Sequence, residues 1–394
     1  MRPDDIVIVA AKRTPAGGLL GSLAALTAPE LGAVAHRAAI AEAGISADDI
    51  DEVISGCVLQ AGIGQAPARQ AAIKADIPVS KGATTINKMC GSGMKAVMLA
   101  HDLIKAGSAN IILAGGMESM SNAPYLLSKA RSGYRLGHGE LKDHMFLDGL
   151  EDAYERGKLM GFYAEATAKH YNFSREQQDT YAARSMTRAL QAQENGSFNQ
   201  EIAPVTIHDR KGDISISKDE GPDAGKLAKM AQLRPAFVAD GTVTAANSSS
   251  ISDGAASLIL MTAANAEKRG LKPLARIVAH ASHAHQPEWF TTAPVSAIRK
   301  VLEKADWQPD DVDLYEINEA FAVVAMAAIS DLELDIEKVN IHGGACALGH
   351  PIGASGARIL VTLIHALKQQ QKHRGVAALC IGGGEATAIA IEVL

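Results

Sequence analysis

The feature of this chain that most limits its fold is a set of short landmarks that occurs twice, in the same order and at nearly the same separation. The matching pairs, at offsets of 262, 263 and 267 residues, are Asp48-Asp49-Ile50-Asp51 with Asp310-Asp311-Val312-Asp313, Gly91-Ser92-Gly93 with Ala354-Ser355-Gly356, and Gly115-Gly116 with Gly382-Gly383. Three landmarks in one order at nearly one offset indicate a duplicated domain.

Within the first copy, apolar runs alternate with segments of helical spacing. Residues 6–10 read as a buried strand, and Thr27-Ala28-Pro29-Glu30 forms a capping box that opens a helix, which Gly44 closes. Further apolar runs cover 53–59 and 111–114, with helical spacing over 93–106 between them. This βαβ order predicts an α/β fold with a buried, mostly parallel sheet and helices on its faces.

A more polar stretch, residues 121–250, separates the two copies and contains a predicted helix over 175–195. It is too long for a structureless surface loop, so we interpret it as an inserted loop domain that covers a site. The expected domains are therefore 1–120 plus 251–272 for the N-terminal half, 121–250 for the insertion, and 273–394 for the C-terminal half.

Composition excludes several classes of protein. The 394 residues are 47% hydrophobic and 21% charged, enough for a large core, and the net charge of -6 argues against binding nucleic acid. The first apolar run is too short for a secretory signal or a membrane span. The four cysteines form no CxxC pair, which favours free thiols in a reducing cytoplasm and no metal site.

Cys90 stands where a strand-like segment gives way to a helix, in Asn87-Lys88-Met89-Cys90-Gly91-Ser92-Gly93, whose glycines permit a sharp turn. A helix N-terminus lowers the pKa of a thiol and offers N–H groups to an anion, so Cys90 is a candidate nucleophile. Taken alone, an isolated cysteine in an apolar chain is more often a buried structural residue.

Three further segments supply polar groups near strand ends. His350 lies in a glycine-rich turn before a helix and is suited to accept a thiol proton. Cys380 is followed by a glycine triplet that includes Gly382, and Asn318 follows the predicted strand 314–317. Side chains at the carboxyl ends of neighbouring strands can converge on one site.

Together these segments resemble the thiolase family along the whole chain. The motifs that carry the resemblance are Arg13-Thr14-Pro15, Asn87 to Gly93, Leu233-Arg234-Pro235-Ala236-Phe237, Asn318-Glu319-Ala320-Phe321-Ala322, Gly349 to Gly356 and Cys380 to Gly384. The resemblance implies two repeated halves in a five-layered αβαβα core. It also implies a reversible Claisen condensation of two acetyl-CoA molecules to acetoacetyl-CoA and CoA, through an acyl-cysteine and without a metal or redox cofactor.

The resemblance also implies roles for single residues. Cys90 would carry the acyl group, His350 would activate it, and Cys380 would remove the α-proton of the second acetyl-CoA. Asn318, through a water, and His350 would form one oxyanion hole, and the N–H groups of Cys90 and Gly382 the other. The residues expected to contact coenzyme A are Ser249, Phe237, Met160, Phe321, Lys226 and Lys229. An ordinary polar turn is the competing interpretation of the serine, and a solvated surface that of the lysines.

Four positions depart from the pattern of biosynthetic thiolases, namely Leu159, Phe290, Pro222 and Glu385. They bear on acyl-chain preference and coenzyme A binding, so a degradative 3-ketoacyl-CoA thiolase with broader chain length stays an alternative. A second alternative is a non-catalytic acyl-CoA-binding protein. The resemblance further suggests a cytoplasmic homotetramer, a dimer of dimers joined with the help of residues 121–139.

Overall fold

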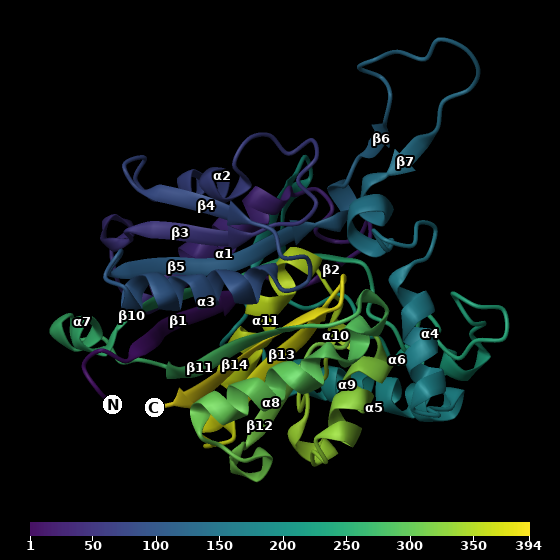
Figure 1. Ribbon diagram of the computed structural model, residues 1–394. Coiled ribbons are helices and arrows are strands. Elements are labelled where there is room, and N and C mark those ends of the chain that lie inside the picture. The colour runs from purple at the N-terminus through teal and green to yellow at the C-terminus, as the bar shows by residue number, and fades with distance from the viewer.

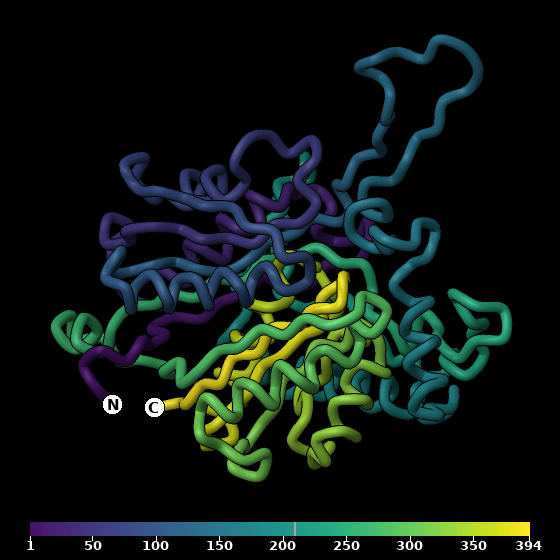
Figure 2. Tube along the Cα trace, viewed as in Figure 1, coloured from purple at the N-terminus to yellow at the C-terminus, as the bar shows by residue number. Residues whose placement is uncertain are grey.

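The computed structural model describes residues 1–208 and 210–394 in full, and at position 209 the backbone alone. Two halves of similar build lie one above the other, and a long arm and several helices project at one side (Figure 1). The two ends of the chain lie close together at the opposite side (Figure 2). In the part of the chain described in full, no helix is long and apolar enough to cross a membrane.

The elements of the N-terminal half are β1 (Ile6–Arg13), β2 (Gly17–Gly18), α1 (Ala28–Ala43), β3 (Glu52–Gly56), α2 (Pro67–Lys74), β4 (Gly82–Ile86), α3 (Ser92–Lys105), β5 (Ile111–Ser119), β10 (Ser252–Thr262) and α7 (Ala263–Lys268). Those of the C-terminal half are β11 (Ala275–Ala284), α8 (Ala293–Ala305), β12 (Leu314–Ile317), α9 (Ala322–Asp331), α10 (Ala345–Leu348), α11 (Ile352–Gln369), β13 (Arg374–Ile381) and β14 (Glu385–Val393).

The segment between β5 and β10 contains two hairpins and three helices. They are β6 (Tyr125–Leu127), β7 (Leu141–Asp143), α4 (Met160–His170), α5 (Arg175–Glu194), β8 (Val205–Asp209), β9 (Gly212–Ile216) and α6 (Ala224–Leu227). The predicted helix over 175–195 is thus present one residue shorter, with Ser174 as its N-cap. The β6–β7 hairpin and its tip form the projecting arm (Figure 1).

The halves are layered as the duplication predicts. Helices α3 and α11 pack against each other in the centre, between the strands of the two halves, while α1 and α2 cover one outer face and α8 the other. The strands follow the order β12-β13-β14-β11-β1-β10-β5-β3-β4, so a short β1–β11 pairing links the halves. The apolar side chains of α3 and α11 fill the space between the strands as the largest core cluster.

Local hydrogen bonds repeat along with the layers. The Asp51 carboxylate accepts bonds from the N–H groups of residues 110 and 111, where β5 begins, and the Asp313 carboxylate does the same for residues 373 and 374, where β13 begins. A short 3₁₀ helix precedes each aspartate, over Ala47–Asp49 before β3 and over Pro309–Asp311 before β12. The repeated Asp cluster therefore has the same structural task in each half, and the predicted duplication is confirmed.

The prediction of a mostly parallel sheet is wrong. Only β3 with β4 and β5, and β12 with β13, pair in parallel, while the neighbours of β1, β10 and β14 are antiparallel. Three residues, 382–384, connect β13 to β14, and such a short connection can join only antiparallel strands. The βαβ order correctly predicted the parallel crossover connections, but it did not predict the antiparallel strands β10 and β14.

Strand β5 also runs past Gly115-Gly116, where the sequence predicted its end. A Cβ atom at Gly116 would stand 2.1 Å from the Gly353 carbonyl oxygen at the start of α11. This glycine therefore permits close packing of strand and helix and does not terminate the strand. The helix α1, in contrast, has the predicted Thr27 capping box and ends at Gly44, whose φ is 66°.

Candidate active site

Cys90 occupies a tight bend between β4 and α3. The residue before it, Met89, has a φ of 48°, which is strained for a side chain of its size. The Ser92 hydroxyl holds the bend, because it donates to the Met89 carbonyl oxygen at 2.7 Å and accepts the Lys88 N–H at 2.8 Å. The bend is thus imposed by hydrogen bonds on Met89, not by a glycine in the left-handed region.

The glycine after the cysteine has another function. Gly91 has a φ of -81°, yet a Cβ atom there would lie 2.3 Å from Cδ1 of Ile381. Only glycine lets the bend approach the end of β13 so closely. Sequence reasoning assigned the glycines to the turn, whereas the structure assigns Gly91 to the contact that brings Cys90 beside the strand of Cys380.

Burial, not the helix terminus, sets the acidity of the candidate nucleophile. Burial raises the pKa of Cys90 to about 11, and the nearby Glu118 carboxylate raises it further, although the N–H groups of Gly382 and of Cys90 itself favour the thiolate. The sequence-based expectation of a lowered pKa is therefore wrong for the protein without substrate. Desolvation of a thiolate outweighs two N–H groups at this position.

Cys380, the last residue but one of β13, is fully buried beside Cys90. Burial raises its pKa well above the ordinary value, and a charge on Cys90 raises it again, so the two sulfurs are electrostatic neighbours. Apolar side chains surround Cys380, among them Phe290, Phe321 and Met160. The two cysteines therefore share one site whose walls are mostly apolar.

The geometry of His350 fixes its tautomer. Its Nδ1 lies 2.5 Å from the Ser355 hydroxyl oxygen, and this hydroxyl donates its single hydrogen to the Pro351 carbonyl oxygen at 2.9 Å. The hydroxyl must therefore accept from Nδ1–H, which leaves Nε2 without a hydrogen. Nε2 is buried and has no hydrogen-bond partner among the fully described residues. Burial lowers the pKa of His350 to about 3, so the ring is neutral near pH 7.

Packing of the two central helices brings this base toward the cysteines. Cys90 precedes α3 and His350 precedes α11, and the first turns of the two helices touch through Gly93 and Ala357. The backbone N–H of His350 also donates to the carbonyl oxygen of Ser250 at 3.0 Å. Residues 260 positions apart in the sequence thus meet because the duplicated helices pair.

Asn318 follows β12, and both atoms of its side-chain amide are buried without a hydrogen-bond partner in the part of the chain described in full. A buried amide in that state is costly unless a ligand or water completes it. The adjoining Glu319, which sequence reasoning did not single out, accepts bonds from Tyr181, Ser185, Asn340 and the N–H of Cys346. This network fixes the loop that carries Asn318.

Glu118 is a second residue that sequence reasoning missed. It is fully buried, and its carboxylate accepts the N–H groups of Val58 and Leu59 at 3.0 Å and of Gly353 at 2.8 Å. It therefore ties the loop after β3 to the first turn of α11, three residues beyond His350. A signal for it was present, namely a carboxylate within the otherwise apolar and small residues of β5.

Most of the expected coenzyme A contacts lie beside the cysteines. The rings of Phe237 and Phe321 meet edge to face at 5.9 Å, Met160 Sδ lies 3.3 Å from where a Gly382 Cβ would stand, and the Ser249 N–H donates to Ala320. The two expected cations lie apart from that cluster. Lys226 and Lys229 are exposed on and after α6, and the Lys226 ammonium donates to the Gly221 carbonyl oxygen at 2.8 Å.

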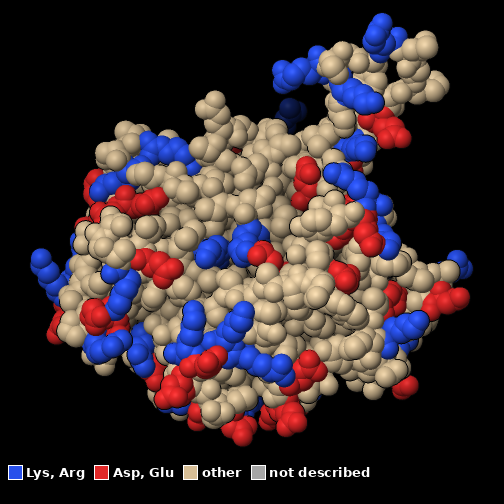
Figure 3. All heavy atoms as spheres, viewed as in Figure 1, with Lys and Arg blue, Asp and Glu red and all other residues tan. Residues whose placement is uncertain are grey.

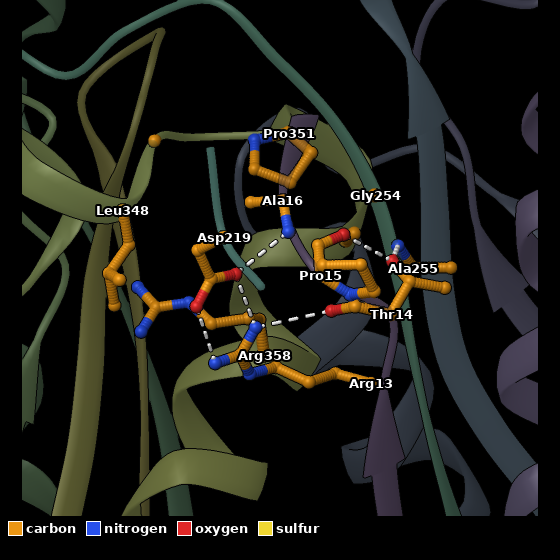
Figure 4. Close-up of a pocket in the computed structure, with 12 residues that line it drawn as sticks. Arg13, Thr14, Pro15, Ala16, Asp219, Gly254, Ala255, Leu348, Pro351 and Arg358 are labelled. Atoms are coloured by element: carbon orange, nitrogen blue, oxygen red, sulfur yellow. Dashed lines mark hydrogen bonds and ion pairs between the residues drawn. The ribbon is translucent and has the colours of Figure 1, made fainter. Parts of the chain in front are cut away.

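A buried ionic cluster lies next to the turn that carries His350. The Arg13 guanidinium donates to both oxygens of Asp219, at 2.7 and 3.0 Å (Figure 4). It also donates to Glu201 at 2.5 Å. Arg13 and Asp219 line a small cavity together with Pro351 and Arg358 (Figure 4). The volume of this cavity is about 10 Å³, which is room for one water. Two carboxylates of the insertion are thereby fixed to the end of β1.

The departures at Phe290 and Glu385 have clear positions. Phe290 is 3% exposed and packs in the apolar cluster around Cys380. The Glu385 carboxylate pairs with the Lys88 ammonium at 2.6 Å, so it joins the start of β14 to the bend of Cys90. Leu159 is the N-cap residue of α4, next to Met160.

We expect Cys90 to be the first of the four thiols to react with iodoacetamide, because it alone of the four is partly exposed. Below a pKa of about 11 the thiolate fraction rises about ten-fold per pH unit, so the rate should climb steadily from pH 7 to 10. Peptide mass mapping at limiting reagent measures both. A rate that levels off near pH 7, or earlier labelling of Cys57 or Cys346, would contradict this assignment.

Comparison with known proteins agrees with this geometry. Residues 6–264 match the model of the thiolase N-terminal domain, and residues 271–393 match that of the thiolase C-terminal domain. Acetyl-CoA acetyltransferases of Cupriavidus necator and Escherichia coli are each 51% identical, with 98% of this chain and 99% of the relative covered. A crystal structure of the Bacillus anthracis acetyl-CoA acetyltransferase superposes with a TM-score of 0.97 at 44% identity, covering 99% of both chains.

The duplicated α/β core, in which Cys90 of one half and Cys380 of the other share one site, together with these relatives defines an acyltransferase. The chain belongs to the thiolase family. The thiolase fold predicted from the motifs is therefore confirmed.

Proposed function

We propose that this protein is an acetyl-CoA C-acetyltransferase that joins two acetyl-CoA molecules into acetoacetyl-CoA and CoA, reversibly, through an acetyl group on Cys90. The observation that carries the proposal is the meeting of two cysteines and one neutral imidazole in a mostly apolar site. The names of the matched relatives, acetyl-CoA acetyltransferases at about half identity over the full length, support the same reaction.

In the first half-reaction the Cys90 sulfur attacks the thioester carbonyl of acetyl-CoA. The unprotonated Nε2 of His350 takes the thiol proton and then gives it to the departing CoA sulfur. Because Cys90 and His350 are both neutral at rest, proton transfer accompanies the attack, and no thiolate–imidazolium ion pair has to form beforehand. The N–H groups of Cys90 and Gly382, which hydrogen-bond the free sulfur, stabilise the oxyanion once the acyl group is attached.

In the second half-reaction Cys380 first releases its thiol proton to solvent, and the resulting thiolate removes an α-proton from another acetyl-CoA. The enolate attacks acetyl-Cys90 and forms the new carbon–carbon bond, Cys90 leaves as a thiolate, and the proton now on Cys380 returns to it. Acetyl-Cys90 cannot ionise, so no charge on Cys90 opposes ionisation of Cys380 in this step. The water held by the Asn318 amide donates to the enolate oxygen, and His350 joins it once Nε2 carries a hydrogen.

The substrates are thus coenzyme A thioesters, and the chemistry needs no metal or redox cofactor. Ser249, Phe237, Phe321 and Met160 contact the pantetheine arm, which suits their place around the cysteines. Lys226 and Lys229 are exposed cations, and they would meet the coenzyme A phosphates away from the reacting cysteines.

Thiolysis of acetoacetyl-CoA by free CoA tests the proposal directly, with acetyl-CoA formation as the readout. A protein that binds acetoacetyl-CoA without turnover would instead be a non-catalytic acyl-CoA-binding protein. The intact placement of Cys90, Cys380 and His350 argues against that alternative.

Chain length separates this proposal from a degradative thiolase. Phe290 is rigid and packs beside Cys380, so it should restrict the acyl pocket. One poorly accommodated methylene is worth about 1–3 kcal/mol, so 3-ketohexanoyl-CoA should be cleaved roughly ten-fold or more less efficiently than acetoacetyl-CoA. The measurement is kcat/KM for substrates of four, six and eight carbons, in the parent, in Phe290→Ala and in the milder Phe290→Met.

Phe290→Ala should raise the relative activity on six carbons, with Phe290→Met in between because methionine adapts to irregular space. Leu159, beside Met160, could open apolar space on the other side of the pocket and so work against this restriction. Undiminished cleavage of the eight-carbon substrate by the parent would move the enzyme to the degradative class.

The same proposal includes a cytoplasmic homotetramer, a dimer of dimers. The β6–β7 arm stands clear of the body and carries exposed Lys and Arg side chains (Figure 3). It also exposes large apolar side chains, with Leu136 98% exposed and Leu141 68%. An arm of this composition is suited to contact other subunits, and light scattering of the parent beside a variant lacking residues 128–140 tests it.

A further inference from the structure

Three ligand-type side chains outside the active site converge on one point. His101 and Asp102 lie near the end of α3, and His280 lies in β11 of the other half (Figure 1). The distances are 2.9 Å from His101 Nδ1 to Asp102 Oδ1, 2.9 Å from His280 Nε2 to the same oxygen, and 3.3 Å between the two nitrogens. The three atoms therefore form a nearly regular triangle.

The size of this triangle matches one face of a metal coordination polyhedron. Zinc binds imidazole nitrogen and carboxylate oxygen at about 2.0–2.2 Å, so two ligand atoms at tetrahedral angles stand about 3.4 Å apart. The two sides of 2.9 Å would need to expand by about 0.5 Å, and the side of 3.3 Å by about 0.1 Å. Because Asp102 is 53% exposed and the histidine side chains 19% and 16%, a fourth position faces solvent.

Hydrogen bonding alone explains the arrangement less well. Hydrogen bonds from both ring nitrogens to the Asp102 oxygen account for two of the three short distances, but a nitrogen that donates to Asp102 has no second hydrogen for the other nitrogen at 3.3 Å. The rings also meet edge to face at 4.9 Å, which aims the nitrogens inward. A divalent cation would satisfy all three lone pairs at once.

We propose that His101, Asp102 and His280 form a binding site for a divalent transition-metal ion, with Zn²⁺ favoured by the two-imidazole, one-carboxylate donor set. The ion would join α3, which begins just after Cys90, to a strand of the C-terminal half. Its role is structural, because the site lies at the far end of α3 from the reacting cysteine. One neighbour opposes binding, since the Lys304 ammonium donates to the His280 carbonyl oxygen at 3.0 Å.

Co²⁺ titration of the full-length protein, followed by visible absorption, tests the site because it reports the ligand type. We expect one tetrahedral Co²⁺ per chain without a thiolate charge-transfer band, which a cysteine-bound ion would show. His280→Gln and His101→Gln should each weaken Co²⁺ binding at least about ten-fold. Removing a residue that only supports a metal ligand already costs that much, and these two residues are ligands themselves. Thiolysis activity and circular dichroism of both variants verify that they fold.

The matched control is His283→Gln, a histidine three residues along the same strand whose Nδ1 contacts Lys300. This variant should bind Co²⁺ like the parent. Excess Zn²⁺ should also raise the Tm of the parent and of His283→Gln but not of His280→Gln, because an ion that binds only the folded state stabilises it. Equal Co²⁺ binding in the parent and in both ligand variants, or a thiolate band as the only signal, would overturn the proposal.

Discussion

Replacing Cys380 with serine is expected to give a protein that still takes an acetyl group from acetyl-CoA onto Cys90 but condenses two acetyl units about 10²–10⁴-fold more slowly. That range is the usual contribution of a positioned acid or base. Cys380 is buried beside Cys90, and a serine hydroxyl keeps the shape of the site but is a far weaker acid than a thiol, so it cannot supply the base. Replacing Cys90 should abolish acetyl labelling altogether.

Mass spectrometry after incubation with acetyl-CoA measures the label, and acetoacetyl-CoA formation measures condensation. Cys57→Ala is the control for loss of a buried thiol, because Cys57 contacts Glu118 and belongs to a different apolar cluster. It should keep its label. Equal loss of the label in the Cys380 and Cys90 variants would show that the two cysteines do not divide the reaction in this way.

Replacing Arg13 with methionine is expected to lower the free energy of unfolding by about 3–5 kcal/mol. The guanidinium is 1% exposed, and its loss leaves Glu201 and Asp219 as buried carboxylates without their counterion. Removing one partner of a buried ion pair typically has this cost, because the remaining charge is no longer compensated. The chain around His350 should loosen as well, since Asp219 and Pro351 line the same cavity.

The matched control is Arg269→Met, because Arg269 pairs with Asp49 at 2.9 Å where both side chains are about a third exposed. A pair at the surface is worth at most about 1 kcal/mol, so this variant should stay near the parent. Urea unfolding followed by fluorescence and by circular dichroism compares the two variants. Similar small losses in both would show that the buried cluster is not a main source of stability.

Much of the site could be predicted because its chemistry lies in short local segments. Cys90, His350 and Asn318 lie where a strand or turn leads into a helix, and Cys380 lies near the end of a strand; glycines and apolar runs mark such places in the sequence. The repeated Asp clusters marked equivalent strand starts, which the Asp51 and Asp313 hydrogen bonds confirm. The domain limits near 120, 250 and 272 stay predictions.

Other properties depend on atoms that are distant in the sequence. The expected low pKa of Cys90 followed from its helix, but burial by other segments raises it. The buried carboxylates Glu118 and Glu319 have partners up to 235 residues away, which no local pattern reveals. Antiparallel pairing of β1 with β10 was equally invisible, because the two strands are far apart in the chain.

The sequence by itself determined the duplication and the order of strands and helices, and it supplied the candidate reactive side chains, because these depend on local spacing and residue type. Tertiary structure alone decided which strands run antiparallel, which nitrogen of His350 is free, and how strongly burial suppresses ionisation of Cys90 and Cys380. The physical reason is that desolvation and hydrogen-bond geometry depend on every atom packed around a group, and packing joins residues that local spacing does not relate.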